Sequence, residues 1–474
     1  MAGALPSTIV ISTSTDNYAS RKERGLVRGG MESLLSPTVK ITVEPAEADN
    51  DHIHLRFTHS NKYWQKLEKG SAIMANSNEP NEEKENPSCT LFKVRVDSDS
   101  ETLYLTHAQT NMSVMFKSER GYGDVLYIEP RRSFTPSPLR FVDAGTLVKL
   151  PKHVAFKAAY NDRFLKADYH RDYTHISGHP VDYRYFHFNS NDQEEFNCGY
   201  EVFPMEDGHV MIKSDYYDKY WLQTNTWIAG AGNDVATPTN KYALFWPIKI
   251  SGKENVIALR SAANNLFCKG LTLDGKYDCL NACDPSMSKY AQLEVHELVS
   301  KRSIRNVRYR MEDARIHGQE PVVVDTVSFD NPTDHEVTVT DSIEYKTENS
   351  YSFTQGLSIT SGVKVSMEAE LPFIGGVKTG IEVHHEITGS FNWGHTKMES
   401  ITHTGTGSVP VPPKSKVIVD CVVTKGTCNI PFTYTQEDQS STTGKIHRSD
   451  HVDGIYEGVS YYNFTFQLKE TLII

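Results

Sequence analysis

The sequence predicts an all-β protein with two tandem β-trefoil domains followed by an elongated domain of long β-strands. An internal duplication covers the first ~300 residues, and a threefold repeat of strand–turn–strand segments lies inside each copy, more weakly in the first. After residue 298 the repeats stop, and long Ser/Thr/Val-rich segments with almost no helical periodicity follow. The predicted domains are 1–148, 149–298 and 299–474. This division fits the usual domain size of about 150 residues.

The duplication is clearest in one aromatic segment. "HIHLRFTHSNKYW" (52–64) matches "HVMIKSDYYDKYW" (209–221), so Lys-Tyr-Trp occurs once in each copy. Further along, "CTLFKVRV" (89–96) aligns with "YALFWPIKI" (242–250). Two copies of one domain therefore precede the third domain.

Three segments of the second copy share one pattern: "VAFKAAYNDRFLKA" (154–167), "VMIKSDYYDKYWLQ" (210–223) and "VIALRSAANNLFCKG" (256–270). Each is typical of a strand, an Asn/Asp turn and a second strand. An unrelated all-β barrel is the alternative, but a threefold period favours the β-trefoil.

Composition and motifs favour a binding protein over an enzyme or a nucleic-acid-binding protein. The formal charge is -11, which argues against a phosphate-backbone partner. "HHEITG" (384–389) begins like a zinc-protease motif but has Gly389 in place of the second histidine. We therefore expect no catalytic residues, no metal site and no cofactor. Seven cysteines without C-x-x-C spacing and an N-terminus without a secretory signal predict a cytoplasmic or nucleocytoplasmic location.

A long two-faced hairpin is predicted between residues 357 and 391. Apolar side chains occupy the odd positions of both arms and polar ones the even positions, around the apolar tip 372–376. Predicted membrane-facing residues are Val363, Val365, Met367, Leu371, Phe373, Ile374, Val377, Ile381 and Val383. Predicted pore-lumen residues are Lys364, Glu368, Glu370, Lys378, Glu382 and Glu386.

Such a hairpin has two interpretations. It could cover a protein core with one face, as many antiparallel hairpins do. The arms, however, exceed the roughly 9–11 residues that a tilted strand needs to cross a bilayer. A lone hairpin cannot span a membrane, because its edges would lack hydrogen-bond partners. Several copies closing into a barrel remove those edges, so this interpretation predicts a homo-oligomer and a membrane partner.

The stretch "ANSNEPNEEKENPSCTLFK" (75–93) resembles the signature of amaranthin-type agglutinins. That resemblance implies tandem β-trefoils that bind the T-antigen disaccharide and N-acetylgalactosamine, with a lectin-mediated dimer in solution. A sugar needs an aromatic ring face and fixed polar groups. Neither copy holds a full set, so a site assembled from both copies stays open. The candidate carbohydrate contacts are Asn76, Asn78, Glu79 and Tyr63 in the first copy, and Trp227, Asn233 and Asp234 in the second. Tyr63 occupies a repeat-consensus position, and aromatic residues at such positions more often belong to the trefoil core.

The third domain resembles the aerolysin-type β-pore-forming proteins. The resemblance rests on the two-faced hairpin together with "DNPTDHEVTVTDSIEYKTENSYSFTQGLSIT" (330–360), "SFNWGHT" (390–396) and "VPVPPKSKVIVDCVV" (409–423). It implies ring assembly, often of about seven protomers, and insertion of the hairpin as a barrel. The resulting hypothesis is a plant defence lectin that binds Gal/GalNAc glycans and forms pores. The alternative is a non-lytic agglutinin or cytosolic stress lectin whose third domain only oligomerises.

Overall fold

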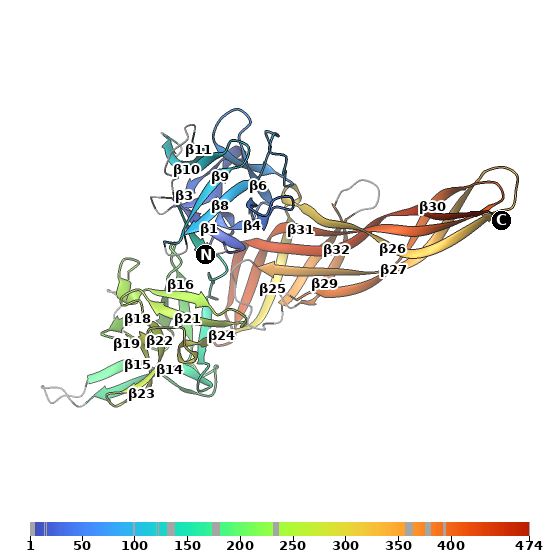
Figure 1. Cartoon of the computed structure of the whole chain (residues 1–474). Helices are drawn as coiled ribbons and strands as arrows, with labels where there is room; N and C mark the ends of the chain where they lie inside the picture. Colours follow the sequence, from blue (N-terminus) through green and yellow to red (C-terminus); the bar gives the residue numbers. More distant parts are fainter. Residues whose placement is uncertain are drawn as a thin grey trace. The chain divides into compact units, whose positions relative to one another are not determined.

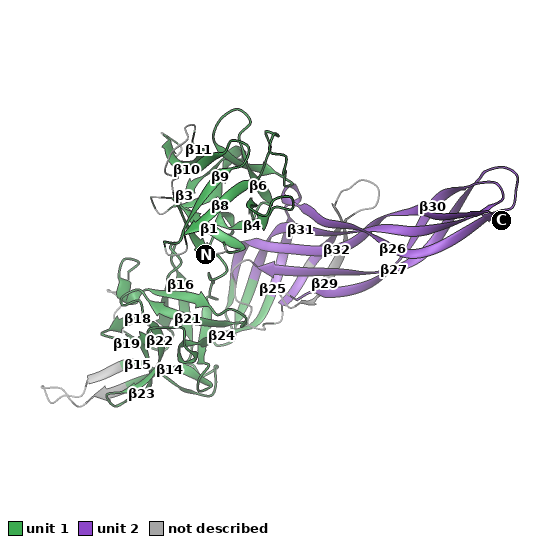
Figure 2. Cartoon of the chain, in the orientation of Figure 1, with its two compact units in different colours: residues 1–302, 357–363, 437–447 green, residues 303–356, 364–436, 448–474 purple. Residues whose placement is uncertain are grey.

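The computed structural model describes residues 5–13, 15, 17–97, 100–119, 121, 123–129, 138–172, 181–230, 237–355, 363, 365–374, 381–391 and 395–473. Within these ranges the chain forms strands and five short 3-10 turns, and no α-helix. The all-β prediction is therefore confirmed. The chain divides into two compact units, residues 1–302 with 357–363 and 437–447, and residues 303–356, 364–436 and 448–474 (Figure 2).

The first trefoil is one twelve-stranded antiparallel sheet that folds on itself (Figure 1). Its core contains the fully buried Phe57, Trp64 and Phe92. The strands are β1 (Thr8–Ser12), β2 (Tyr18–Arg21), β3 (Val27–Gly30), β4 (Ile41–Pro45), β5 (His52–Phe57), β6 (Lys62–Lys66), β7 (Ile73–Ser77), β8 (Phe92–Asp97), β9 (Thr102–His107), β10 (Met112–Glu119), β11 (Gly123–Ile128) and β12 (Leu139–Asp143), with 3-10 turns η1 (Glu23–Gly25) and η2 (Pro37–Val39).

The second trefoil repeats this arrangement with a second twelve-stranded sheet around Phe156, Phe186 and Trp221. Its strands are β13 (His153–Ala158), β14 (Arg163–Asp172), β15 (Val181–Ser190), β16 (Tyr200–Pro204), β17 (Val210–Ser214), β18 (Lys219–Thr224), β19 (Trp227–Gly230), β20 (Phe245–Lys249), β21 (Val256–Ser261), β22 (Phe267–Leu273), β23 (Lys276–Asp284) and β24 (Leu293–Glu297), with η3 (Lys241–Ala243) and η4 (Lys289–Ala291).

The predicted Asn/Asp turns have a backbone reason. Asn61, Asp162, Asp218 and Asn265 each sit between paired strands with φ of 52°, 60°, 54° and 60°. Asn and Asp tolerate this left-handed conformation better than other residues with a β carbon. The recurring Asn or Asp is thus the residue that closes each repeated hairpin.

Much longer strands build the second unit, in the order β29-β28-β25-β31-β32-β27-β30 with β26 paired to β31. Their length matches the elongated domain that the sequence predicts. The strands are β25 (Val299–Tyr309), β26 (Arg315–Asn331), β27 (Val337–Gln355), β28 (Val365–Ile374), β29 (Ile381–Phe391), β30 (Lys397–Val411), β31 (Ser415–Ser440) and β32 (Ile446–Ile473), and the 3-10 turn is η5 (Met311–Asp313).

Two glycines of β30 accept aromatic rings from β32. A β carbon on Gly405 would collide with the ring of Phe464, and one on Gly407 would lie 2.6 Å from the ring of Phe466. Tyr345 of β27 stacks on Phe464 with ring centroids 5.3 Å apart. Glycine in a strand interior commonly marks such close packing.

Candidate functional site

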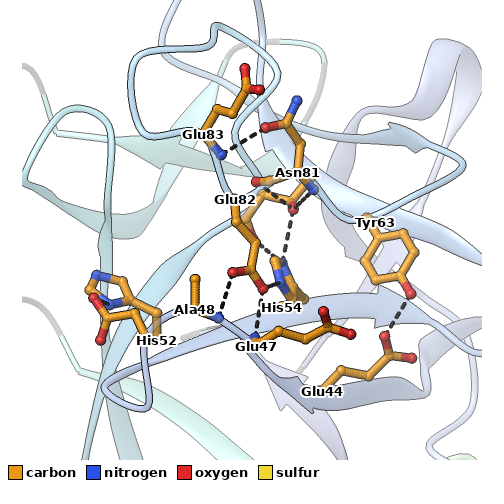
Figure 3. Close-up of polar contacts among 11 residues, drawn as sticks. Glu44, Glu47, Ala48, His52, His54, Tyr63, Asn81, Glu82 and Glu83 are labelled. Atoms are coloured by element: carbon orange, nitrogen blue, oxygen red, sulfur yellow. Dashed lines mark hydrogen bonds and ion pairs between the residues drawn. The ribbon is translucent and has the colours of Figure 1, made fainter.

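The signature 75–93 forms a loop of the first trefoil that is anchored by one carboxylate. Glu82 accepts hydrogen bonds from the backbone N–H of Glu47 at 2.7 Å and of Ala48 at 2.8 Å, and its Oε1 lies 3.1 Å from His54 Nε2 (Figure 3). Thr90 Oγ1 lies 2.9 Å from His54 Nδ1, on the other side of the buried imidazole. Much of the signature therefore shapes the loop.

The charge of Glu82 is part of this anchor. Burial by itself would raise the pKa of the carboxyl, but the N–H groups of Glu47 and Ala48 and the His54 ring outweigh it and lower the pKa. A carboxylate with a lowered folded-state pKa stabilises above its unfolded value, about 4.3. The contribution is lost as the pH falls through the folded value.

Replacing Glu82 with Gln is expected to loosen the loop at neutral pH. The amide keeps one acceptor oxygen but loses the charge, which should cost on the order of 1 kcal/mol. Backbone amides near residues 47 and 48 should then exchange about fivefold faster, as measured by hydrogen–deuterium exchange mass spectrometry. The difference from wild type should shrink below about pH 4.

Glu85→Gln is the matched control, because Glu85 is exposed on the same loop. Equal exchange in the Glu82→Gln protein and the wild type at neutral pH would contradict the anchoring role.

Three predicted sugar contacts lie together at the end of β7, where Asn76, Asn78 and Glu79 are all exposed. Asn76 Nδ2 donates to the carbonyl of Arg24 at 2.9 Å. Lys62 Nζ donates to Asn78 Oδ1 at 2.6 Å, and Ser77 Oγ donates to the carbonyl of Glu79 at 2.6 Å. The structure thus presents two oriented amides and one carboxylate on a single surface segment.

The two aromatic candidates for sugar contact are buried rather than exposed at the surface. Tyr63 is fully buried, and its hydroxyl donates to Glu44 at 2.6 Å, so its ring face is not available to a ligand. Trp227 is only 9% exposed and packs with Tyr185 and under Lys276, whose Nζ lies 5.0 Å from the indole. Both rings are therefore packed inside the protein, Tyr63 at a consensus position of the repeat and Trp227 in a small cluster of the second trefoil. Asn233 and Asp234 lie outside the described residues.

The first arm of the two-faced hairpin is strand β28, and its apolar face is stored in a protein core. Val365 and Met367 are 2% exposed and Ala369 is 7% exposed. They pack in one cluster with Phe432 and Tyr456. Leu371 packs partly buried against this cluster, Val363 is half-buried, and Glu370 is exposed. The two-residue alternation along β28 therefore separates a buried face from a polar one.

Two tyrosine hydroxyls fasten β28 to this core. Tyr309 donates to the carbonyl of Glu370 at 2.6 Å, and Tyr456 donates to the carbonyl of Pro372 at 2.7 Å. Burial raises the pKa of both tyrosines, so the hydroxyls stay protonated donors. Ser366 Oγ also donates to Ser303 Oγ at 3.0 Å, between β28 and β25.

The register of β28 against β29 shifts near the hairpin tip. Ala369 pairs with Ile387, but after a bulge between Glu370 and Pro372 the partner of Pro372 is Val383. Phe373 then pairs with Glu382, and Ile374 with Ile381. The strict alternation expected over the whole arm is interrupted at this bulge. The side chains of the remaining predicted hairpin residues lie outside the described ones, namely Lys364, Glu368, Phe373, Ile374, Val377, Lys378, Ile381, Glu382, Val383 and Glu386.

Across the described ranges, no group of three His, Cys, Asp or Glu side chains is placed to hold a metal ion. No helix in the described part of the chain has the length and apolar character to cross a membrane.

Two family models match the chain in succession. The Agglutinin domain model matches residues 7–120 and 148–297. The model of Clostridium epsilon toxin ETX/Bacillus mosquitocidal toxin MTX2 matches residues 296–465.

Curated relatives include two natterins of Thalassophryne nattereri. Natterin-1 is 29% identical over 182 residues, which are 36% of this chain and 50% of natterin-1. Natterin-4 is 32% identical over 176 residues, which are 36% of this chain and 43% of natterin-4. The chain spans about half the length of the curated relatives it matches.

Similar solved structures include the lamprey immune protein, at 13% identity and a TM-score of 0.29, covering 78% of this chain and 86% of that one. The aerolysin-like protein of Bombina maxima is 17% identical with a TM-score of 0.22, covering 36% of this chain and 99% of that one.

Proposed function

Because the chain belongs to the agglutinin family and also carries an ETX/MTX2 aerolysin-like toxin domain, we propose that it is a lectin that perforates glycan-bearing membranes. The trefoils bind Gal/GalNAc glycans of the T-antigen type, and copies of the chain assemble into a ring. The hairpin of β28 and β29 then leaves its core and inserts as part of a β-barrel. We further propose a cytoplasmic or nucleocytoplasmic store of the protein and a role in plant defence.

The storage of β28 is the observation that supports this proposal most strongly. The strand buries an apolar face that a barrel would turn toward lipid, and the exposed Glu370 lies on the other face. Each apolar side chain leaving the core forfeits about 1.5–3 kcal/mol until lipid covers it again. A trigger is needed, and two lectin domains supply one by concentrating the chain on a glycan surface.

Dye release from liposomes tests the proposal directly. We expect release from vesicles that display the T-antigen disaccharide, and at least about tenfold less from the same vesicles without it, because avidity drives assembly. Free disaccharide in the medium should inhibit release. Binding to the glycan vesicles with full retention of dye would instead identify a non-lytic agglutinin. If the protein bound neither kind of vesicle, the proposed T-antigen specificity would be refuted.

A further inference from the structure

A group of exposed aromatic rings lies on the second trefoil, and the sequence patterns did not single it out. Tyr169 of β14 is 50% exposed, Phe196 of the β15–β16 loop 70%, and Tyr216 of the β17–β18 turn 38%. The rings of Phe196 and Tyr216 meet edge to face at 5.0 Å, and those of Tyr169 and Tyr216 at 6.2 Å. These three residues are called the aromatic triad below.

The triad is held by the trefoil core. Tyr217 is 7% exposed, belongs to the main core cluster, and donates its hydroxyl to the carbonyl of Tyr185 at 3.0 Å. Its ring lies 5.1 Å from Tyr169 and 5.3 Å from Tyr216. The loop that carries Phe196 is tied to β14 by Asn197, whose Nδ2 donates to the carbonyl of Ala167 at 3.1 Å. The ring positions are therefore fixed before any ligand arrives, which lowers the entropic cost of binding.

The turn between the two strands does not require the Tyr216 ring. In the repeat alignment, His59 and Ser60 of the first copy stand where the second copy has Tyr216 and Tyr217. The first copy closes the same β5–β6 turn without them. Several large aromatic side chains that touch each other at a surface usually mark a binding site.

The surroundings favour a neutral, hydroxyl-rich ligand. Asp168 and Asp215 adjoin the triad in sequence, Glu194 precedes Phe196 by two residues, and Arg184 is the cross-strand partner of Tyr169; all four are exposed. Carboxylates accept hydrogen bonds from sugar hydroxyls. Three carboxylates against the one guanidinium of Arg184 leave these neighbours with an excess of negative charge, which disfavours an anionic lipid surface and a second copy of a chain whose net charge is -11.

We propose that the aromatic triad is a carbohydrate-binding site separate from the β7 loop of the first trefoil. Its ligand is a neutral hexopyranose whose apolar C–H face lies on the rings while neighbouring carboxylates accept its hydroxyls. The inference rests on the lectin half of the proposed function and is independent of pore formation. Two sites on one chain would let it bridge neighbouring glycans.

Saturation-transfer NMR on the full chain, with methyl β-galactopyranoside and methyl β-glucopyranoside as probes, tests this site. The variant Tyr216→His/Phe196→Ser replaces Tyr216 with the residue that the first copy has at this position, His59. It also removes the ring of Phe196, the most exposed of the three. We expect it to bind at least one glycoside about tenfold more weakly than wild type, the loss typical of an aromatic contact. Tyr216→Phe keeps the ring and should retain binding.

Asn78→Ala/Glu79→Ala, in the first trefoil, is the matched control and should keep the triad signal. If only this control loses binding, or if the wild type shows transfer from neither glycoside, the triad is not a sugar site. Two other results for the triad variant would also overturn the inference if its glycoside binding were unchanged. One is a loss of binding to glycan-free vesicles, and the other is the loss of a dimer in sedimentation. The dye-release experiment reports on the pore proposal separately.

Discussion

Oxidised Ser303→Cys/Ser366→Cys protein is expected to bind glycan liposomes like wild type and to release almost no dye until a reductant is added. The two serine hydroxyl oxygens lie 3.0 Å apart between β25 and β28. Disulfides form between β carbons about 3.5–4.5 Å apart, and the hydroxyl contact shows that the two side chains face each other. The bond would fasten β28 to the core that must release it, so dye release should fall by about 100-fold or more.

Reversibility distinguishes an effect of the disulfide from a general loss of function caused by the two substitutions. Adding dithiothreitol should restore release to the wild-type rate, and each single cysteine variant should behave like wild type under oxidant. The seven native thiols are free, and all but Cys283 are buried, so they should not compete for the new cysteines. A locked protein that still empties the vesicles would show that the hairpin is not the inserted segment.

The lock is a cleaner test than placing a charge on the apolar face. An aspartate in place of Val365 would oppose insertion into lipid. The Val365 side chain is, however, only 2% exposed in the folded core, so the same substitution would also bury a charge there. An unpaired buried charge destabilises a folded core strongly. Loss of leakage in such a variant would therefore not distinguish failed insertion from failed folding.

Replacing Arg302 with Ala is expected to destabilise the segment 437–447 by about 3–5 kcal/mol, because it leaves the buried Glu297 carboxylate and the partly buried Asp438 carboxylate without their cation. The Arg302 side chain is 6% exposed, and those of Glu297 and Asp438 are 5% and 19% exposed. Its guanidinium donates to both oxygens of Asp438, at 2.7 and 2.8 Å, and contacts Glu297. This fork ties the C-terminal end of β31 to the last residue of β24, just before the turn that leads to β32.

Hydrogen exchange should locate the effect. Ser441 N–H donates to the carbonyl of Leu298 at 3.1 Å, so this amide should lose protection in the Arg302→Ala protein. Arg302→Lys keeps the charge but loses the two-pronged geometry, and an intermediate effect is expected. Lys301→Ala, at an exposed neighbouring position, should change stability by less than about 0.5 kcal/mol. Unchanged protection in Arg302→Ala would contradict the proposed role of this fork.

The periodic features of the fold could be predicted from the sequence. Recurrent turn residues such as Asn61 and Asp218 marked the repeated hairpins, since their left-handed backbone is a local property. The alternation around Val365 and Met367 likewise predicted one apolar face, and the structure places that face in a core. The alternation predicts which side chains share a face of the strand. It does not predict what that face packs against, because the strands that cover it are distant in sequence.

The candidate sites were harder to predict because they depend on contacts distant in sequence. Tyr63 stands beside an equally aromatic Trp64, and only the packing shows that both are buried. Glu82 resembled a surface acid in a polar loop, yet it binds the backbone about 35 residues earlier in the chain. Tyr216 could have been noticed, because it breaks the match with the first copy at a position that the turn leaves open.

The two ring-accepting glycines of β30 also restrict how β32 can move. Gly405 and Gly407 are two residues apart, as are Phe464 and Phe466, so each ring occupies its own gap. Sliding β32 by one residue would turn both rings to the opposite side. A slide by two would press one phenyl group against a side chain such as His403 or Val409, where no gap exists. The two ring contacts thus oppose movement of β32 along its own axis.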